Sequence, residues 1–337
     1  MLLSVTIFSQ LIIMMIIAIA GFVFAKVSDV GEREEKFISK ILLYFINPCL
    51  IVSSFNIPFD VEKFFGLIFS IILSLIITLI FILISELFFR NNPSYNPIQK
   101  LANSFTNCGF IGIPLITVVF GSSGVFYLMG YLVVFNVLLW IYGYHQMSGS
   151  INLKKIFTNP NIIAVLIGLI IFVNPIKLPQ MIHMPLSMIA GLNTAMSMIF
   201  LGILFGSLKK EWIKKFFLTL KSFFVKDKNL INARKKVCSV LFTTFIRLIF
   251  SGIISCGICY LVIFVFRKYF AFANLDLIEY VTKIVLIASL CPAGISVSTF
   301  ACLFNKDSVY SNFLVCFTHI LCVITIPLIL TFFLNFI

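Results

Sequence analysis

Charged side chains are scarce in this sequence, and acidic ones are the scarcest. Asp and Glu together number 12 among 337 residues, whereas apolar residues make up 61% and Phe alone contributes 40. A soluble domain of this size cannot bury so much apolar surface, but a lipid bilayer accepts it. We find no HExxH motif, no Ser-His-Asp arrangement and no paired carboxylates at workable spacing. We therefore expect an integral membrane protein that is not an enzyme.

Charge is missing altogether from two long stretches. Residues 1–25 carry none, so the basic region that opens a cleaved signal peptide is absent, and we expect the first spanning helix there. Residues 101–153 also carry none and are too long for one crossing. The polar turn Gly121-Ser122-Ser123-Gly124 is expected to divide them into two helices.

Cysteine occurs nine times without forming a recognisable framework. Cys256 and Cys259 have CxxC spacing, but no second CxxC or histidine pair accompanies them. We therefore interpret the cysteines as small apolar packing residues, and we expect no metal and no cofactor.

Reading from one charge cluster to the next places ten transmembrane helices, with a few residues of error at each end. We expect the fourth and fifth within 101–153, on either side of the turn at 121–124, and the others at about 3–25, 37–56, 63–89, 159–174, 183–206, 238–266, 279–303 and 308–336. The chain divides into a first five-helix repeat (1–146), a link (147–157) and a second five-helix repeat (158–337) that contains a basic linker at 207–237. An odd number of crossings per half gives the halves opposite orientations, which is the inverted repeat of many secondary transporters.

The basic residues predict the orientation. With the N-terminus outside, inner loops carry nineteen of the 25 Lys and Arg residues, outer loops carry five, and Arg247 lies within a helix. Both termini are then expected outside a cytoplasmic membrane. Within the linker, Trp212 to Phe224 alternates Lys with Phe and Leu, which favours a helix lying on anionic lipid over an RNA-binding arm.

Two helices in corresponding positions of the halves are expected to be broken. The fourth contains FTNCGFIGIP at 105–114 and the ninth contains SLCPAGIS at 289–296. Proline removes a backbone donor, and unpaired backbone groups inside a membrane are tolerated only against protein or a water-filled cavity. Matched breaks therefore predict a binding site where half-helix N-termini attract an anion. Candidate residues are Asn107, Gly112, Pro114, Pro292 and Ser296 at the breaks, and Asn47, Pro48 and Asn193 on the second and seventh helices.

These motifs carry a resemblance. FTNCGFIGIPL at 105–115, FGSSG at 120–124, NPNIIAVLIG at 159–168, FLGILFG at 200–206 and SLCPAGIS at 289–296 resemble the auxin efflux carrier family. That family includes bacterial permeases for malate- or malonate-like dicarboxylates. The resemblance implies a ten-helix, five-plus-five fold in which Pro114 and Pro292 mark the crossing and Asn107 supplies its polar group. The plant carriers' long middle loop is absent, which argues against auxin itself.

Ionisable residues inside the membrane are further candidates. Arg247 could be the counter-charge for an anion or could extend to the inner interface, and His319 could be a core histidine or a proton-coupling group. No Asp or Glu falls near either break, which disfavours a sodium site.

We predict a secondary transporter for a small organic anion, a carboxylate or dicarboxylate, with a sodium-coupled symporter of the bile-acid type as the alternative. A channel would need rings of pore-lining polar residues, and none is found. The expected partners are the anion, the lipid bilayer and, in a homodimer, a second copy of the chain. No nucleic acid is expected.

Overall fold

A computed structural model describes residues 2–90, 95–150, 158–174, 178–208, 231–269 and 274–334. The regular secondary structure of these residues is helical, apart from one isolated β-bridge. Several helices begin at side-chain caps: Asp60 accepts a hydrogen bond from the Glu62 amide, and Asn159 accepts one from Asn161. The helices, with π-turns marked η, are α1 (Leu2–Val27), α2 (Glu32–Ile41), η1 (Leu42–Ile46), α3 (Asn47–Ser54), α4 (Val61–Phe88), α5 (Asn96–Ser104), η2 (Cys108–Gly112), α6 (Ile113–Leu138), η3 (Leu139–Gly143), α7 (Tyr144–Ser148), α9 (Pro160–Val173), α10 (Gln180–Ser207), α12 (Ile231–Phe245), η5 (Ile246–Phe250), α13 (Ser251–Tyr269), α14 (Leu275–Leu290), α15 (Ser296–Leu303) and α16 (Ser308–Leu334).

By length and apolar composition, 7 helical stretches of the described chain can each cross a membrane. The predicted fourth and fifth spans lie largely in one of them, Cys108–Ser148, which has 41 residues and is twice the length that one crossing needs. Its backbone leaves the helical region at Gly121 (φ 65°), so the expected turn is present as a kink. The predicted sixth span is the short helix α9, and the ninth is divided between α14 and α15.

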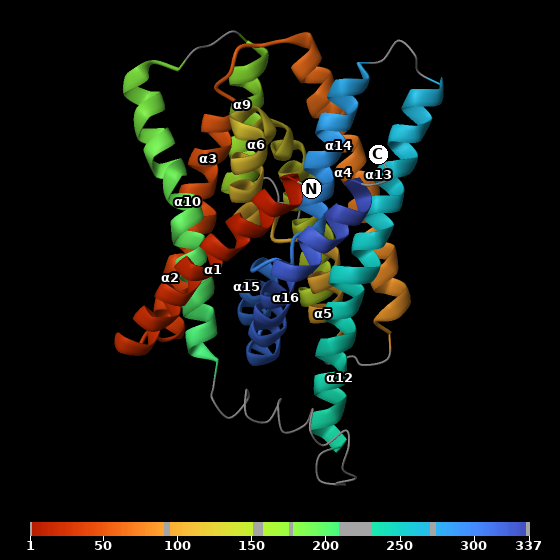
Figure 1. The fold of residues 1–337 in the computed structure, drawn as a ribbon. Coiled ribbons are helices and arrows are strands. Elements are labelled where there is room, and N and C mark those ends of the chain that lie inside the picture. Colours follow the sequence, from red (N-terminus) through yellow and green to blue (C-terminus); the bar gives the residue numbers. More distant parts are fainter. Residues whose placement is uncertain are drawn as a thin grey trace.

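The helices form two groups that face each other. In what we call the panel group (α1, α2, η1, α3, α9 and α10), α1 packs along α10, and α3 packs against α9 and α10. In what we call the crossover group (α4, α5, η2, α6, η3, α13, α14, α15 and α16), α4 packs against α5, α6 and α14, and α13 packs against α14. Figure 1 shows α10 and α3 on one side of the molecule and α4 and α13 on the other.

Close backbone contact holds α1 to α10. A Cβ atom added to Gly202 would lie 1.9 Å from the carbonyl oxygen of Ala18, and one added to Gly21 would lie 2.4 Å from that of Ile199. Small residues allow such an approach between membrane helices, where packing and not water exclusion drives association. The panel group therefore has a tightly packed helix pair at its centre.

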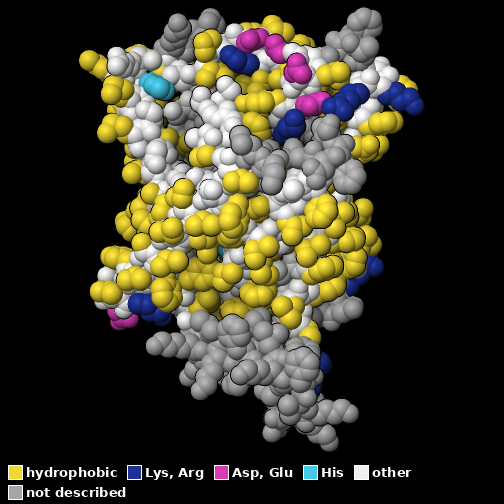
Figure 2. Space-filling model, viewed as in Figure 1, with side chains coloured by type: hydrophobic (Ala, Val, Ile, Leu, Met, Phe, Trp, Pro, Cys, Tyr) yellow, Lys and Arg dark blue, Asp and Glu magenta, His cyan; other side chains and the backbone are white. Residues whose placement is uncertain are grey.

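The surface has the distribution of a membrane protein. Figure 2 shows apolar side chains over a broad band of one face, with most of the visible charged side chains toward the two ends. Large exposed apolar residues occur along the long helices, such as Ile16 (60%) on α1 and Leu83 (58%) on α4. Such a band fits a lipid environment, in which outward apolar side chains carry no cost.

Candidate functional site

Two interrupted helices cross at the centre of the candidate site. Residues 105–107 separate α5 from η2, and residues 291–295 separate α14 from α15. Thr106 and Ala293 form the isolated antiparallel bridge. The backbone N–H of Asn107 donates to the Pro292 carbonyl oxygen (2.7 Å), and the backbone N–H of Gly294 donates to the Phe105 carbonyl oxygen (2.8 Å). The predicted breaks therefore exist, and each supplies backbone partners to the other.

Local sequence explains the break in the second half better than the break in the first. Cys291 is extended (ψ 150°) because the residue before a proline is disfavoured in the helical region. Pro114, in contrast, does not lie at the crossing. It lies inside the helical stretch Cys108–Ser148, directly after the π-turn η2, and the break is at residues 105–107. The prediction that Pro114 marks the crossing is wrong.

Arg247 supports the crossing from behind. The backbone N–H of Asn107 donates to Pro292 O, and the backbone N–H of Ala293 donates to Thr318 Oγ1. The carbonyl oxygens four residues earlier, those of Asn103 and Ser289, therefore lack their usual helical donors. Arg247 replaces those donors. It is 1% exposed, and Nη1 donates to Asn103 O (2.9 Å), while Nη2 donates to Cys291 O (2.8 Å) and also to Ser289 O.

A cavity of about 460 Å³ lies between the two groups of helices. The panel group lines it with α2, η1, α3, α9 and α10, and the crossover group lines it with η2, α6, η3, α15 and α16. It extends from Thr106 and Asn107, which are buried, to Lys36 and Lys40, which are exposed. Its apolar wall consists of Phe110, Leu132, Phe135, Leu139, Trp140, Phe200, Leu204 and Phe300.

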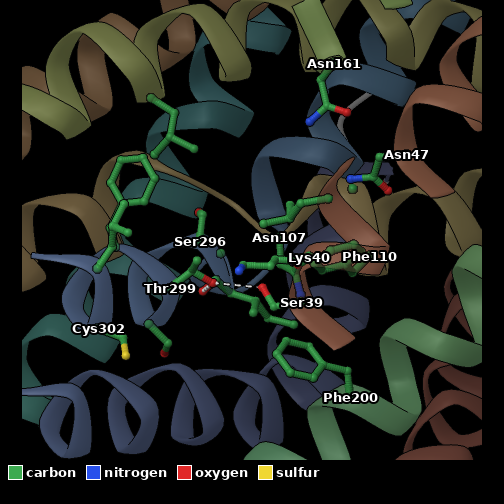
Figure 3. A pocket seen from close by; sticks show the side chains of 18 of the residues that line it. Ser39, Lys40, Asn47, Asn107, Phe110, Asn161, Phe200, Ser296, Thr299 and Cys302 are labelled. Carbon is green, nitrogen blue, oxygen red and sulfur yellow. Dashed lines mark hydrogen bonds between the residues drawn. The ribbon is translucent and has the colours of Figure 1, made fainter. Parts of the chain in front are cut away.

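The inner end of the cavity, which we call its floor, is polar. Asn107 is 3% exposed, and its Nδ2 lies 2.7 Å from His319 Nε2. Ser296 and Ser298 are 9% and 4% exposed, and their hydroxyl oxygens have no hydrogen-bond partner among the described residues. Figure 3 shows Asn107, Ser296 and Thr299 around the same space. A buried hydroxyl without a partner favours a ligand, because leaving it unpaired costs about 1–3 kcal/mol.

The charged residues of the cavity lie on α2, toward the end opposite its floor. Lys36, Lys40 and Glu35 on α2 are the charged residues of its lining, so cations are in excess. Ser39 and Thr299 lie 3.4 Å apart, oxygen to oxygen, and link α2 to α15 across the space (Figure 3). This hydrogen bond therefore joins the panel group to the crossover group.

The cavity brings together three of the nine residues predicted for the site: Asn47, Asn107 and Ser296. The others do not line it. Pro48 follows Asn47 on α3, and Gly112 ends η2. Pro292 belongs to the crossing through its carbonyl oxygen. Asn193 supports it from α10, because its Nδ2 donates to Gly109 O (3.1 Å).

Arg247 is also absent from the lining of the cavity, and its position corrects the role expected for it. Its guanidinium donates four hydrogen bonds to backbone carbonyls at or beside the two breaks, so it stabilises the crossing instead of facing the cavity. The predicted counter-charge role has no support from this geometry.

Several lining residues were missed in the sequence. Lys36, Lys40, Leu43 and Asn47 recur at helical spacing on one face of α2–η1–α3, and this periodicity could have identified them. Asn161 was noted only within a motif that starts a helix. It is 5% exposed, and its Oδ1 has no partner among the described residues.

The part of the chain that the structure describes contains no candidate metal site. No group of three or more His, Cys, Asp or Glu side chains is placed to hold an ion there. The described cysteines are free thiols. The central part of the basic linker, residues 209–230, lies outside the described residues.

Comparison with known proteins links the first part of the chain to one family. Residues 6–152, less than half of the chain, match the model of a family described as membrane transport protein. No curated protein matches the chain. The matched region covers α1 to α7 and so includes the first break, Asn47 and Asn107. The family consists of transporters and not of enzymes. Through these residues the chain is similar to a family of multi-pass membrane transport proteins, that of the auxin efflux carriers.

Proposed function

We propose that this protein is a secondary active transporter that moves a small organic anion, a carboxylate or dicarboxylate, across the cytoplasmic membrane by alternating access. The observation that carries the proposal is the cavity between two helix groups that ends at two paired helix breaks. At a broken helix, backbone N–H and C=O groups and helix ends are available to bind a substrate in the cavity, whereas a continuous helix uses these groups in its own hydrogen bonds.

The charge of the cavity supports an anion. Two lysines and one glutamate line it, and no Asp or Glu lies at the crossing. The N-terminus of α15 begins at Ser296 on the cavity floor, where a helix presents roughly half a positive charge. The free hydroxyls of Ser296 and Ser298 add donors for a carboxylate there. The aromatic wall accommodates an apolar body behind that carboxylate.

The packing of the helices supports two inverted five-helix halves with ten crossings. The first helix of each half packs against the second helix of the other: α1 against α10, and α9 against α3. The fourth helix of each half is the broken one. Such an exchange of partners is expected from a pseudo-two-fold axis in the membrane plane. Movement of the crossover group against the panel group would then alternate access to the cavity.

The basic residues assign a side to the cavity. It reaches the exposed side chains of Lys36 and Lys40, at the end of the molecule that the positive-inside rule places in the cytoplasm. The conformation is therefore open to the cytoplasm, and both chain termini face outward.

A sodium-coupled symporter remains the second candidate, because of one observation. Asn47 and Asn161 line the cavity, and their Oδ1 atoms accept no hydrogen bond from the described residues. Amide oxygens are hard ligands of the kind that sodium prefers. No carboxylate lies at the crossing to complete such a site, which is why we rank this candidate second.

Uptake into proteoliposomes tests the proposal. Labelled malonate, malate, benzoate and indole-3-acetate would be offered under a sodium gradient and a pH gradient imposed separately. We expect uptake of at least one carboxylate by the natural chain and loss of that uptake in Asn107→Ala. The matched control Asn174→Ala, at the exposed end of α9, should transport normally. Uptake of none of these anions would refute the proposal, and strict dependence on sodium would favour the second candidate.

A further inference from the structure

The side chains of His319 and Asn107 have a defined hydrogen-bond polarity. His319 is fully buried, and its Nδ1 lies 2.7 Å from the carbonyl oxygen of Val315. A carbonyl oxygen can only accept, so Nδ1 carries a proton. In a neutral ring Nε2 then has a lone pair, and Asn107 donates to it through Nδ2 at 2.7 Å. Neutral His319 therefore fixes which end of the Asn107 amide it contacts.

This polarity determines what Asn107 offers the cavity. No hydrogen bond among the described residues uses Asn107 Oδ1, and Asn107 lines the cavity floor. With neutral His319, the floor therefore presents a carbonyl oxygen. A carboxylate oxygen is repelled there, because both groups are acceptors.

Protonation of His319 reverses the arrangement. Both ring nitrogens are then donors, and Nε2–H requires an acceptor. Asn107 meets that requirement by rotating its amide by about 180°, a change between the two wells of an sp³–sp² torsion that preserves the side chain's shape. Its NH₂ group then faces the cavity and donates to a carboxylate. One proton thus converts the floor from an acceptor to a donor.

We propose that His319 is a positioning residue that couples the binding of one proton to the binding of one carboxylate, by setting the orientation of the Asn107 amide. This inference rests on the proposed transport function and names its coupling ion. The proton comes from water in the cavity and binds His319 Nε2, and no bond to the substrate forms or breaks. Each ligand favours the other, because binding linkage is reciprocal.

The surroundings leave His319 as the group that titrates. On its own helix the neighbouring ionisable groups are thiols, and thiols also occupy the two breaks; ordinary thiols stay neutral below about pH 8. Arg247 on η5 is engaged by carbonyls, α1 offers no ionisable group over residues 2–25, and the ionisable residue of α10 is His183, near its outer end. The groups concerned are Cys316 and Cys322 on α16, Cys108 and Cys291 at the breaks, Cys302 on α15, and Glu35, Lys36 and Lys40 across the cavity on α2.

The first arm of the test observes the imidazole itself. The variant His145→Gln/His183→Gln leaves His319 as the chain's one histidine, since the sequence has 3. With ¹⁵N-labelled histidine in proteoliposomes, NMR should report a neutral Nδ1–H tautomer. Addition of malonate or benzoate at constant pH should then protonate Nε2. A neutral Nε2–H tautomer would overturn the inference without any reference to transport.

The second arm measures coupling. We expect the apparent affinity for malonate or benzoate in the natural chain to strengthen by up to about tenfold per unit fall in pH, the limit for one linked proton. His319→Gln should still exchange the anion but lose this dependence, and His145→Gln, at an exposed position, should retain it. An unchanged pH dependence in His319→Gln overturns the coupling role. Absence of anion binding in every protein refutes the proposed function, whereas the tautomer is still decided by NMR.

Discussion

Replacing Arg247 by Met should destabilise the protein far more than it changes substrate affinity. The substitution keeps an apolar side chain but removes the donors to three buried carbonyl oxygens, those of Asn103, Ser289 and Cys291. Each buried carbonyl that loses its donor costs about 1–3 kcal/mol. The sum, roughly 3–9 kcal/mol, is comparable with the whole unfolding free energy of a typical protein, about 5–15 kcal/mol.

The assay is thermal unfolding of purified protein in detergent, with Arg267→Met as the control. Arg267 is 46% exposed and pairs with Glu279 at 2.5 Å, an ion pair of the kind that contributes about 0–1 kcal/mol. We expect Arg247→Met to give little folded protein or a large fall in the unfolding temperature, and Arg267→Met to behave like the natural chain. The reasoning is refuted if Arg247→Met is as stable as the control but no longer binds carboxylates. Arg247 would then be the counter-charge that the sequence suggested.

Three further predictions concern packing, gating and orientation. Gly202→Ala should prevent folding, because its Cβ would lie 1.9 Å from Ala18 O. Gly191→Ala on the same helix meets nothing within 4 Å and should stabilise the folded protein by about 0.5–1 kcal/mol. Thermal unfolding of the purified variants checks both expectations. Ser39→Ala removes the hydrogen bond between the two helix groups, so malonate binding to inverted vesicles should weaken about 2- to 10-fold, the effect of losing about 0.5–1.5 kcal/mol, and equal binding would exclude a gating role. A protease site inserted at residue 227 should be cut in inverted vesicles and resist cleavage in intact cells, and the reverse would invert the proposed orientation.

Much of the fold was predictable because lipid imposes a simple rule. A spanning helix needs about 20 apolar residues, and the charge clusters that end each run are visible in the sequence. The break before α15 was predictable for a local reason, since Pro292 cannot continue a helix. The break after α5 lies within the predicted segment 105–114, but its cause is tertiary and is not the proline at 114. The backbone N–H of Asn107 donates to the carbonyl oxygen of Pro292 instead of to a carbonyl of its own helix.

The candidate site was predictable where a polar residue lies at a break or, as with Asn47, stands alone in an apolar helix. Asn107 and Ser296 were found for that reason. Arg247 was misinterpreted because its partners are backbone carbonyls, which no sequence pattern indicates. The link between Asn107 and His319 spans 212 positions in the chain and depends on the crossing itself. Lys36 and Lys40 were counted as loop charges, although their spacing on one helix face was available.

Protection of an engineered thiol by a carboxylate tests the central claim most directly, that the crossing at the cavity floor binds the anion from the basic end of the molecule. Ser296→Cys would be made with Cys302→Ser, since Cys302 also lines the cavity, and the single variant Cys302→Ser is the reference. A membrane-impermeant thiol reagent should label Cys at position 296 in inverted vesicles, and malonate or another transported carboxylate should slow that labelling. Labelling that is unaffected by every transported carboxylate would place the binding site elsewhere and contradict the account.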